Sequence, residues 1–120
     1  MAALVPQQIS RLPAVTQTFV VPDQAGTETT GGNTVPPDDR VFLEFENTNA
    51  AARTITVYVP AAGDTDQYGR TNTADLTYSL AATTGRRRIG PLDRSLAQAD
   101  GMVHFTVDAN AGVTCAALRI

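Results

Sequence analysis

The chain has 120 residues and a formal net charge of −3, with 42% hydrophobic and 18% charged residues. A chain of this length fits one domain and buries about 65% of its unfolded surface, so folding requires neither a disulfide nor a metal. The hydrophobic content excludes an intrinsically disordered chain. One cysteine and one histidine exclude a disulfide framework and a Cys/His zinc site.

The N-terminal stretch, residues 1–15, has no helical or strand period and is interrupted by Pro6 and Pro13. It is too apolar for a free tail, so we expect an extended arm that packs against another surface, while residues 16–120 form the domain. No stretch is apolar for long enough to span a membrane, and the arm lacks the charged segment of a secretory signal, so we expect synthesis in the cytoplasm. The large apolar residues of the arm, which are candidate partner contacts, are Leu4, Val5, Ile9 and Leu12.

Strand and loop signals alternate after the arm. Residues 17–21 predict a first strand, which ends at Pro22. Residues 23–40 are rich in glycine, threonine and proline, so we expect a long loop in which Pro36-Pro37 excludes a central strand. A second polar loop is expected at residues 61–73. Loops of this length in compact domains are usually functional or disordered, so both are candidate contact regions.

The clearest strands are residues 40–46 and 53–59, where apolar and polar residues alternate with a period of two. A short turn separates them, so we expect an antiparallel pair. Phe42 and Tyr58 fall on the outer face of this pair, as a second packed face or as an apolar patch for a partner. The inward residues that the alternation predicts are Val41, Leu43, Phe45, Ile55, Val57 and Val59.

Further strands are expected in the second half of the chain, separated by glycine-containing turns. Residues 92–100 could form one helical turn, with Leu92 and Leu96 at i and i+4. About seven short strands without a clear helix are typical of an all-β, single-domain antiparallel β-sandwich, either Ig-like or jelly-roll-like. The ranges of these further strands are 75–80, 86–89, 102–108 and 113–120.

Several sequence motifs follow one another in a characteristic order. They are Phe42-Leu43-Glu44-Phe45-Glu46-Asn47, Thr54-Ile55-Thr56-Val57, Gly85 with Arg87-Arg88-Ile89-Gly90-Pro91, Asp100-Gly101-Met102-Val103-His104-Phe105-Thr106, and the C-terminal run from Gly112 to Ile120. Over residues 33–120 this order resembles the small head decoration or minor capsid proteins that tailed phages of actinobacteria encode beside their major capsid protein.

The resemblance implies a structural role without enzymatic activity or cofactor. Many copies would bind the outside of an icosahedral head and clamp neighbouring subunits of the major capsid protein. It implies a homo-oligomer, with a trimer favoured, on the exterior of the virion. Two alternatives stay open: a head–tail connector or tail protein, present in a handful of copies, and a carbohydrate- or receptor-binding module. The chain has no tryptophan for stacking on a sugar, which disfavours the second alternative.

Three consecutive arginines, Arg86, Arg87 and Arg88, are the most unusual local feature. In a strand they must project to both faces of the sheet. Their charge could keep an edge strand from pairing with other chains, or their guanidinium groups could bind carboxylates on an acidic surface of a capsid neighbour. Nucleic acid is disfavoured as a partner, because the chain is acidic and has no basic stripe interleaved with aromatic residues.

Other reactive residue types favour structural roles. His104 falls on the outer face of its strand with no nucleophile motif beside it, so we expect a surface residue rather than a catalytic base. Cys115 lies in an apolar strand, which indicates a buried, unreactive thiol. Asp64, Asp66 and Asp75 lack the further ligands of a calcium loop, so a polar turn is expected. Because no phosphate-binding glycine loop or nucleophile elbow is present, the sequence predicts no enzyme, no metal and no cofactor.

Overall fold

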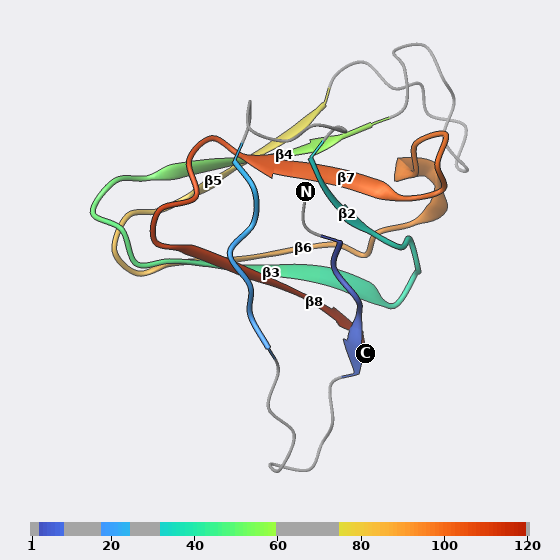
Figure 1. The fold of residues 1–120 in the computed structure, drawn as a ribbon, viewed down its shortest axis with the longest axis horizontal. Helices are drawn as coiled ribbons and strands as arrows, with labels where there is room; N and C mark the ends of the chain where they lie inside the picture. The colour runs from blue at the N-terminus through green and yellow to red at the C-terminus, as the bar shows by residue number, and fades with distance from the viewer. Residues whose placement is uncertain (1–2, 9–17, 25–31, 60–74, 120) are drawn as a thin grey trace.

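The computed structural model describes residues 3–8, 18–24, 32–59 and 75–119, which form a two-layered β-sandwich (Figure 1). We name the two layers the β4 sheet and the β3 sheet. The β4 sheet has the order β2 (Asn33–Val35), β7 (Val103–Val107), β4 (Arg53–Tyr58) and β5 (Leu76–Leu80). The β3 sheet has the order β1 (Gln7–Gln8), β8 (Val113–Arg119), β3 (Val41–Asn47) and β6 (Gly85–Ile89). The predicted β-sandwich is therefore confirmed.

The strands pair in a nested order, which identifies the type of sandwich. β1 pairs with β8, β2 with β7, β3 with β6 and β4 with β5. Contacts of β3 with β8 and of β4 with β7 join these pairs into the two sheets. All of these pairs are antiparallel except β1 with β8, which is parallel. Among the strands of the described residues, only the connection from β4 to β5 stays within one sheet, and this is a jelly-roll topology.

The predicted antiparallel pairing of the strands β3 and β4 is wrong, because the two strands belong to different sheets. Asn47, fully buried at the end of β3, holds the crossing between the layers. Its side-chain nitrogen donates to the carbonyls of Ala51 and Ala81, each at 3.0 Å, and its oxygen accepts the N–H of Asn49 at 3.0 Å. These bonds satisfy the buried amide while they direct the chain into the other layer.

The core lies between the two sheets and follows the alternation of the sequence. Phe45 and Phe105, one from each sheet, are fully buried and meet edge to face, with ring centroids 5.5 Å apart and ring planes at 88°. Val59, at the end of its run, is only half-buried. The remaining predicted inward residues all lie in this core: Val41, Leu43, Phe45, Ile55 and Val57.

A second, smaller apolar cluster lies on the outer face of the β3 sheet. It consists of Phe42, Ala116 and Leu118, with Phe19 packed against them. Phe42 therefore serves as a second packed face rather than as an open patch. Tyr58 belongs to the other sheet, where its hydroxyl lies 2.9 Å from the hydroxyl of Thr106, so Phe42 and Tyr58 share no common face.

Two segments before β3 differ from the prediction. β2 lies inside the predicted loop 23–40, because a strand of three residues is too short to show alternation, and it ends directly before Pro36-Pro37. The described part of the predicted first strand, residues 18–21, forms only a single bridge from Val20 to β8. The predicted loop 61–73 lies outside the described residues. The predicted helical turn is present as a 3-10 turn, Arg94–Leu96.

Candidate interaction surfaces

The three arginines lie on β6, the outermost strand of the β3 sheet, with exposed side chains. Arg86 and Arg88 stand directly opposite Glu46 and Glu44 on β3. The nitrogen–oxygen distances of these two ion pairs are 3.4 Å and 3.1 Å. Exposed pairs of this kind contribute about 0–1 kcal/mol to stability, so their main effect is to orient the guanidinium groups.

Arg87 projects to the opposite side of β6, toward the open end between the two sheets. Its guanidinium lies 5.1 Å from the ring centroid of Tyr78 on β5 and donates to the carbonyl of Ser79 at 3.1 Å. The arginines therefore project to both faces, as their spacing predicts. The contacts described for them are within this chain, and binding of an acidic partner surface stays a prediction.

Two N-terminal segments, residues 3–8 and 18–24, run across one side of the sandwich, from β2 and β7 in the β4 sheet to β8 in the β3 sheet (Figure 1). The side chain of Gln7 ties them together: its nitrogen donates to the carbonyl of Thr18 at 2.8 Å, and its oxygen accepts the Thr18 N–H at 2.7 Å. Gln7 itself lies in β1, which pairs with the end of β8, and Val20 bridges the same strand. We call the surface formed by these two segments the N-terminal face.

Leu4 is not available to a partner, which corrects its assignment as a contact residue. It is only 6% exposed within the core, and its N–H donates to the carbonyl of Thr34 at 2.7 Å. The described part of the predicted arm thus packs on its own domain, because the sandwich has an apolar site for it. Val5 points outward and is 77% exposed. Ile9 and Leu12 lie outside the described residues.

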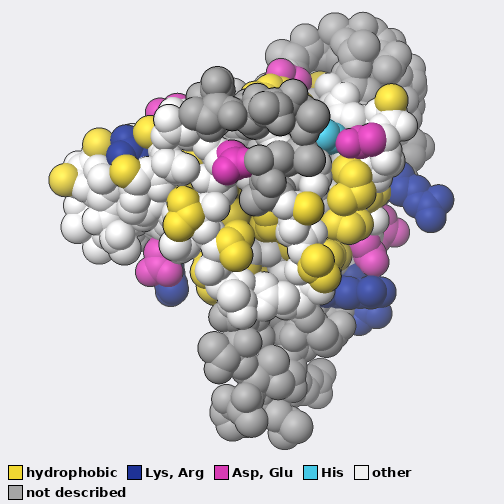
Figure 2. Space-filling view, viewed as in Figure 1, with side chains coloured by type: hydrophobic (Ala, Val, Ile, Leu, Met, Phe, Trp, Pro, Cys, Tyr) yellow, Lys and Arg dark blue, Asp and Glu magenta, His cyan; other side chains and the backbone are white. Residues whose placement is uncertain are grey.

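Hydrophobic side chains are concentrated on the N-terminal face. Val5, Val20 and Val21 account for three of the four large hydrophobic residues that are exposed in the described part of the chain. Val5 and Val20 line a groove of about 270 Å³, against residues of β8. Figure 2, which shows this side of the molecule, has hydrophobic side chains spread over its centre. Exposed apolar side chains that gather on one face make that face a candidate interaction site.

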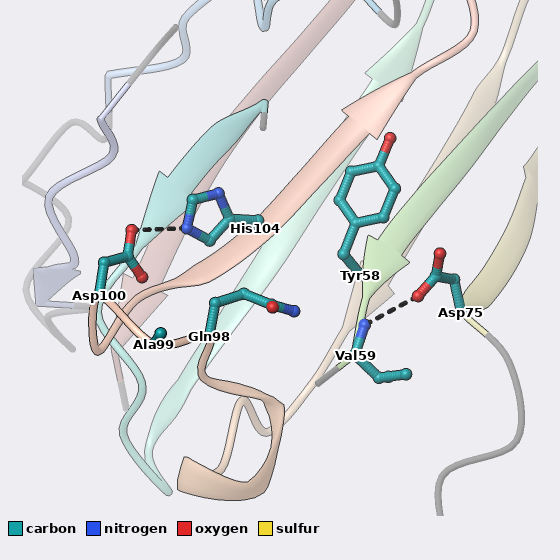
Figure 3. A pocket seen from close by; sticks show the side chains of 7 residues that line it. All are labelled: Tyr58, Val59, Asp75, Gln98, Ala99, Asp100 and His104. Atoms are coloured by element: carbon teal, nitrogen blue, oxygen red, sulfur yellow. Dashed lines mark hydrogen bonds and ion pairs between the residues drawn. The ribbon is translucent and has the colours of Figure 1, made fainter. Parts of the chain in front are cut away.

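A separate pocket of about 500 Å³ opens beside the ends of β4 and β7 (Figure 3). His104 lies on one side of it, buried, with its Nε2 atom 2.7 Å from a carboxylate oxygen of Asp100. The backbone N–H of Met102 and the His104 ring hold the pKa of the Asp100 carboxyl below its usual value. The residues that line the pocket are Tyr58, Val59, Asp75, Gln98, Ala99, Asp100 and His104.

The prediction that His104 lies at the surface is wrong. The alternating pattern correctly places the His104 side chain on the face of β7 that points away from the core, but every residue of β7 is buried. Whether a face is covered depends on the packing of distant segments, which alternation does not report.

Most of the residues that line the pocket are polar, and several of them are held by contacts within the chain. Its described lining holds no serine, threonine or cysteine. Its tyrosine, Tyr58, has its hydroxyl bonded to Thr106, and Asp75 accepts the backbone N–H of Val59 at 3.0 Å. Within the described residues no cluster of histidine, cysteine or carboxylate groups could hold a metal. The candidate calcium residues Asp64 and Asp66 lie outside those residues.

Cys115 is buried in β8, as predicted, and burial raises the pKa of its thiol to about 12. At neutral pH the group is therefore the protonated thiol, which is a poor nucleophile.

We expect iodoacetamide at pH 8 to leave the folded protein unlabelled and to label it rapidly in urea at the same pH, as measured by mass spectrometry. Folding raises the pKa of this thiol from about 9 to about 12, so ionisation of the thiol favours the unfolded chain. The folded chain therefore keeps its full stability at neutral pH and loses stability as the pH rises from about 9 toward 12. Equal labelling rates with and without urea would contradict the burial of the thiol.

The N-terminal face and the pocket at His104 are two surfaces of the described chain with room for a partner. The described residues contain no helix that is long and apolar enough to cross a membrane. Comparisons of the chain with family models, with curated proteins and with solved structures find no match.

Proposed function

We propose that the chain is a non-enzymatic structural protein of a tailed-phage virion, a decoration protein that binds the outside of the head and stabilises contacts between subunits of the major capsid protein. The observation that carries the proposal is the exposed apolar surface of the N-terminal face, with Val5 at 77%, Val21 at 59% and Val20 at 40% exposure. The sequence resemblance over residues 33–120 supports the phage assignment. The jelly-roll fold also occurs in viral capsid domains, but a fold alone does not determine function.

The N-terminal face is suited to binding because its backbone is already ordered. Leu4 anchors one segment in the core, and Gln7 ties it to the other segment through Thr18. Binding to a capsid surface therefore costs little conformational entropy. Burial of about 1,600 Å² in total is enough for a stable contact. A protein that binds only the assembled shell stabilises that shell by mass action.

The arginines of β6 provide polar contacts in addition to the apolar surface. The side chains of Arg86 and Arg88 are 67% and 66% exposed despite their ion pairs with glutamates. A guanidinium group has five N–H donors, so each arginine keeps donors for a carboxylate on a neighbouring capsid subunit. A strand edge with this charge favours an acidic protein surface as the partner.

The first test is the number of copies per particle. We expect quantitative mass spectrometry of purified virions whose genome encodes this chain to find it in a simple ratio to the major capsid protein. A handful of copies per virion would instead assign the chain to the connector or the tail. Absence from purified particles would overturn both structural roles.

The second test targets the N-terminal face without removing it. Deletion of residues 1–15 is unsuitable, because Leu4 and β1 belong to the folded domain. We expect the double variant V5D/V21D to keep its melting temperature and to bind virions that lack the chain at least tenfold more weakly, because two charges would have to be desolvated at the contact.

The variant A50D/A52D is the matched control, because it adds the same two charges at exposed positions in the turn between β3 and β4, outside the N-terminal face. It should bind virions like the wild-type chain. Equal binding by V5D/V21D and the wild-type chain would remove the N-terminal face from the contact.

One observation favours the carbohydrate- or receptor-binding alternative: the pocket beside His104, which presents histidine, carboxylate, amide and phenol groups. Jelly rolls also occur in lectin domains. If the chain is absent from particles, NMR titration with simple sugars is the next experiment, and shifts of the amides of residues 98–104 would support this alternative.

A further inference from the structure

The free edge of the β4 sheet is β5, whose five residues are Leu76-Thr77-Tyr78-Ser79-Leu80. Within the residues that the structure describes, no strand pairs with β5 on the side away from β4. Such an edge presents unpaired N–H and C=O groups on which another strand can pair. β6, the neighbouring edge of the other sheet, carries three arginines, whereas β5 carries no charged residue. The two edges therefore differ in the charge that their own residues carry.

The hydrogen bonds of β4 show which backbone groups of β5 face outward. The N–H of Thr54 donates to the side chain of Asp108 at 2.9 Å, and the Thr54 carbonyl accepts the Asp108 N–H at 3.0 Å. Both groups of Thr54 therefore point toward β7, although Thr54 stands opposite Ser79 in the register of β4 with β5. In an antiparallel pair both backbone groups of a residue point to the same side, so those of Ser79 point away from β4. The bond from Arg87 to the Ser79 carbonyl agrees with this direction.

Because the direction of the backbone groups alternates along a strand, the N–H and C=O groups of Thr77, two residues before Ser79, also point away from β4. Thr77 stands opposite Thr56. Thr77 and Ser79 thus present their N–H and C=O groups outward, and their side chains are exposed. The groups of Leu76, Tyr78 and Leu80 face β4. Two residues of β5 can therefore accept a new strand without loss of any bond to β4.

The order of side chains in β5 is symmetric about Tyr78. A leucine, a hydroxyl residue, the tyrosine, a hydroxyl residue and a leucine follow one another. When two copies of β5 run antiparallel about a two-fold axis at Tyr78, Thr77 of each copy stands opposite Ser79 of the other. The outward N–H of each then meets an outward C=O, hydroxyl faces hydroxyl, and β5 itself brings no charged side chain to the pair.

We propose that β5 is a homodimerisation edge, at which two copies of this chain join their four-stranded β4 sheets into one continuous sheet. The two-fold arrangement is isologous and closes after two copies, so it forms no fibre. Leu76, which is 37% exposed in the single chain, becomes covered. Arg87 stays compatible with pairing, because the Ser79 carbonyl has a second lone pair for the incoming N–H. The proposal does not rest on the capsid role, and it replaces the trimer that the resemblance implies with a dimer.

The test is a charge swap across the two-fold axis, followed by sedimentation velocity over a range of protein concentrations. We expect the wild-type chain to show a monomer–dimer equilibrium. T77K/S79K places lysine opposite lysine, and T77D/S79D places aspartate opposite aspartate, so each variant alone should dimerise at least tenfold more weakly. An equal mixture of the two pairs lysine with aspartate and should restore the dimer.

T54K is the control for the charge swap, because it adds a lysine on the same face of the sheet but on β4, one strand away from the edge. It should leave dimerisation unchanged. A wild-type chain that stays monomeric at the highest concentration, or that sediments as a trimer, would overturn the proposal. Failure of the mixture to recover the dimer would overturn the assignment to β5.

Hydrogen exchange of the wild-type chain gives an answer even if the variants fail to fold. The amides of Thr77 and Ser79 face outward, so their exchange should slow at least tenfold between dilute and concentrated protein. The amide of Tyr78, which faces β4, should be protected at both concentrations. Exchange at residues 77 and 79 that is independent of concentration would contradict the pairing.

Discussion

Replacement of Phe45 by alanine is expected to lower the free energy of unfolding by about 3–5 kcal/mol. The ring is fully buried at the centre of the sandwich and packs edge to face against Phe105 on the opposite sheet. The substitution removes the transfer free energy of the ring and leaves a cavity between two sheets that cannot close around it. Because domains are stable by about 5–15 kcal/mol, this loss is a large part of the total.

The measurement is urea unfolding followed by circular dichroism, with Phe42→Ala as the matched control. Phe42 lies on the same strand, three residues earlier, in the small cluster on the outer face. Its cavity opens toward solvent and Arg88, whose guanidinium lies 5.3 Å from the ring centroid. Phe42→Ala should therefore cost less than half as much as Phe45→Ala, and equal costs would place the main core elsewhere.

Replacement of Gly112 by alanine is the second large expected effect, with a loss of about 2–5 kcal/mol. Gly112 has a φ of +77°, which strains any residue that carries a Cβ atom. A Cβ atom there would also lie 2.7 Å from the Cβ of Asn49 and 2.8 Å from its backbone nitrogen. Those atoms belong to the crossing from β3 to β4, which Asn47 holds in place, so they cannot easily move.

Gly101→Ala separates the two contributions. Gly101 has a φ of +81°, and a Cβ atom there would meet nothing within 4 Å. This variant should show the backbone strain alone, about 1–2 kcal/mol, when both glycine variants are unfolded in urea and followed by circular dichroism. If Gly101→Ala and Gly112→Ala lose the same stability, Asn49 does not lie as close to Gly112 as the structure describes.

The inward faces of the strands could be predicted from the sequence because side chains in a strand alternate with a period of two. Leu43 and Phe45, and likewise Ile55 and Val57, lie in the core as their spacing indicates. Sheet membership could not be predicted in this way. The residues between β3 and β4 could form a tight hairpin or a crossing, and the choice depends on the bonds of Asn47 to Ala81 and to other distant groups.

The contacts of the β6 arginines and of the N-terminal residues could be predicted only in part, because they too depend on which distant segments become neighbours. The spacing of Arg86, Arg87 and Arg88 predicts exposure on both faces, but their contacts with Glu46, Glu44 and Tyr78 depend on register and on which strands become neighbours. In the same way, an apolar residue in an extended segment is suited equally to the chain's own core and to a partner. Of the described arm residues, Leu4 lies in the core and Val5 faces solvent, and their composition does not separate them.

The place of β8 in the nested strand order has a consequence for synthesis of the chain. β8 is made after the other seven described strands, yet it lies in the interior of its sheet, between β1 and β3. Until it emerges, β3 lacks one neighbour, β1 has no strand to pair with, and Phe42 lacks Ala116 and Leu118. The domain therefore cannot close until β8 has been made, and a message that breaks off before the codon for Val113 yields only an open, incomplete sandwich.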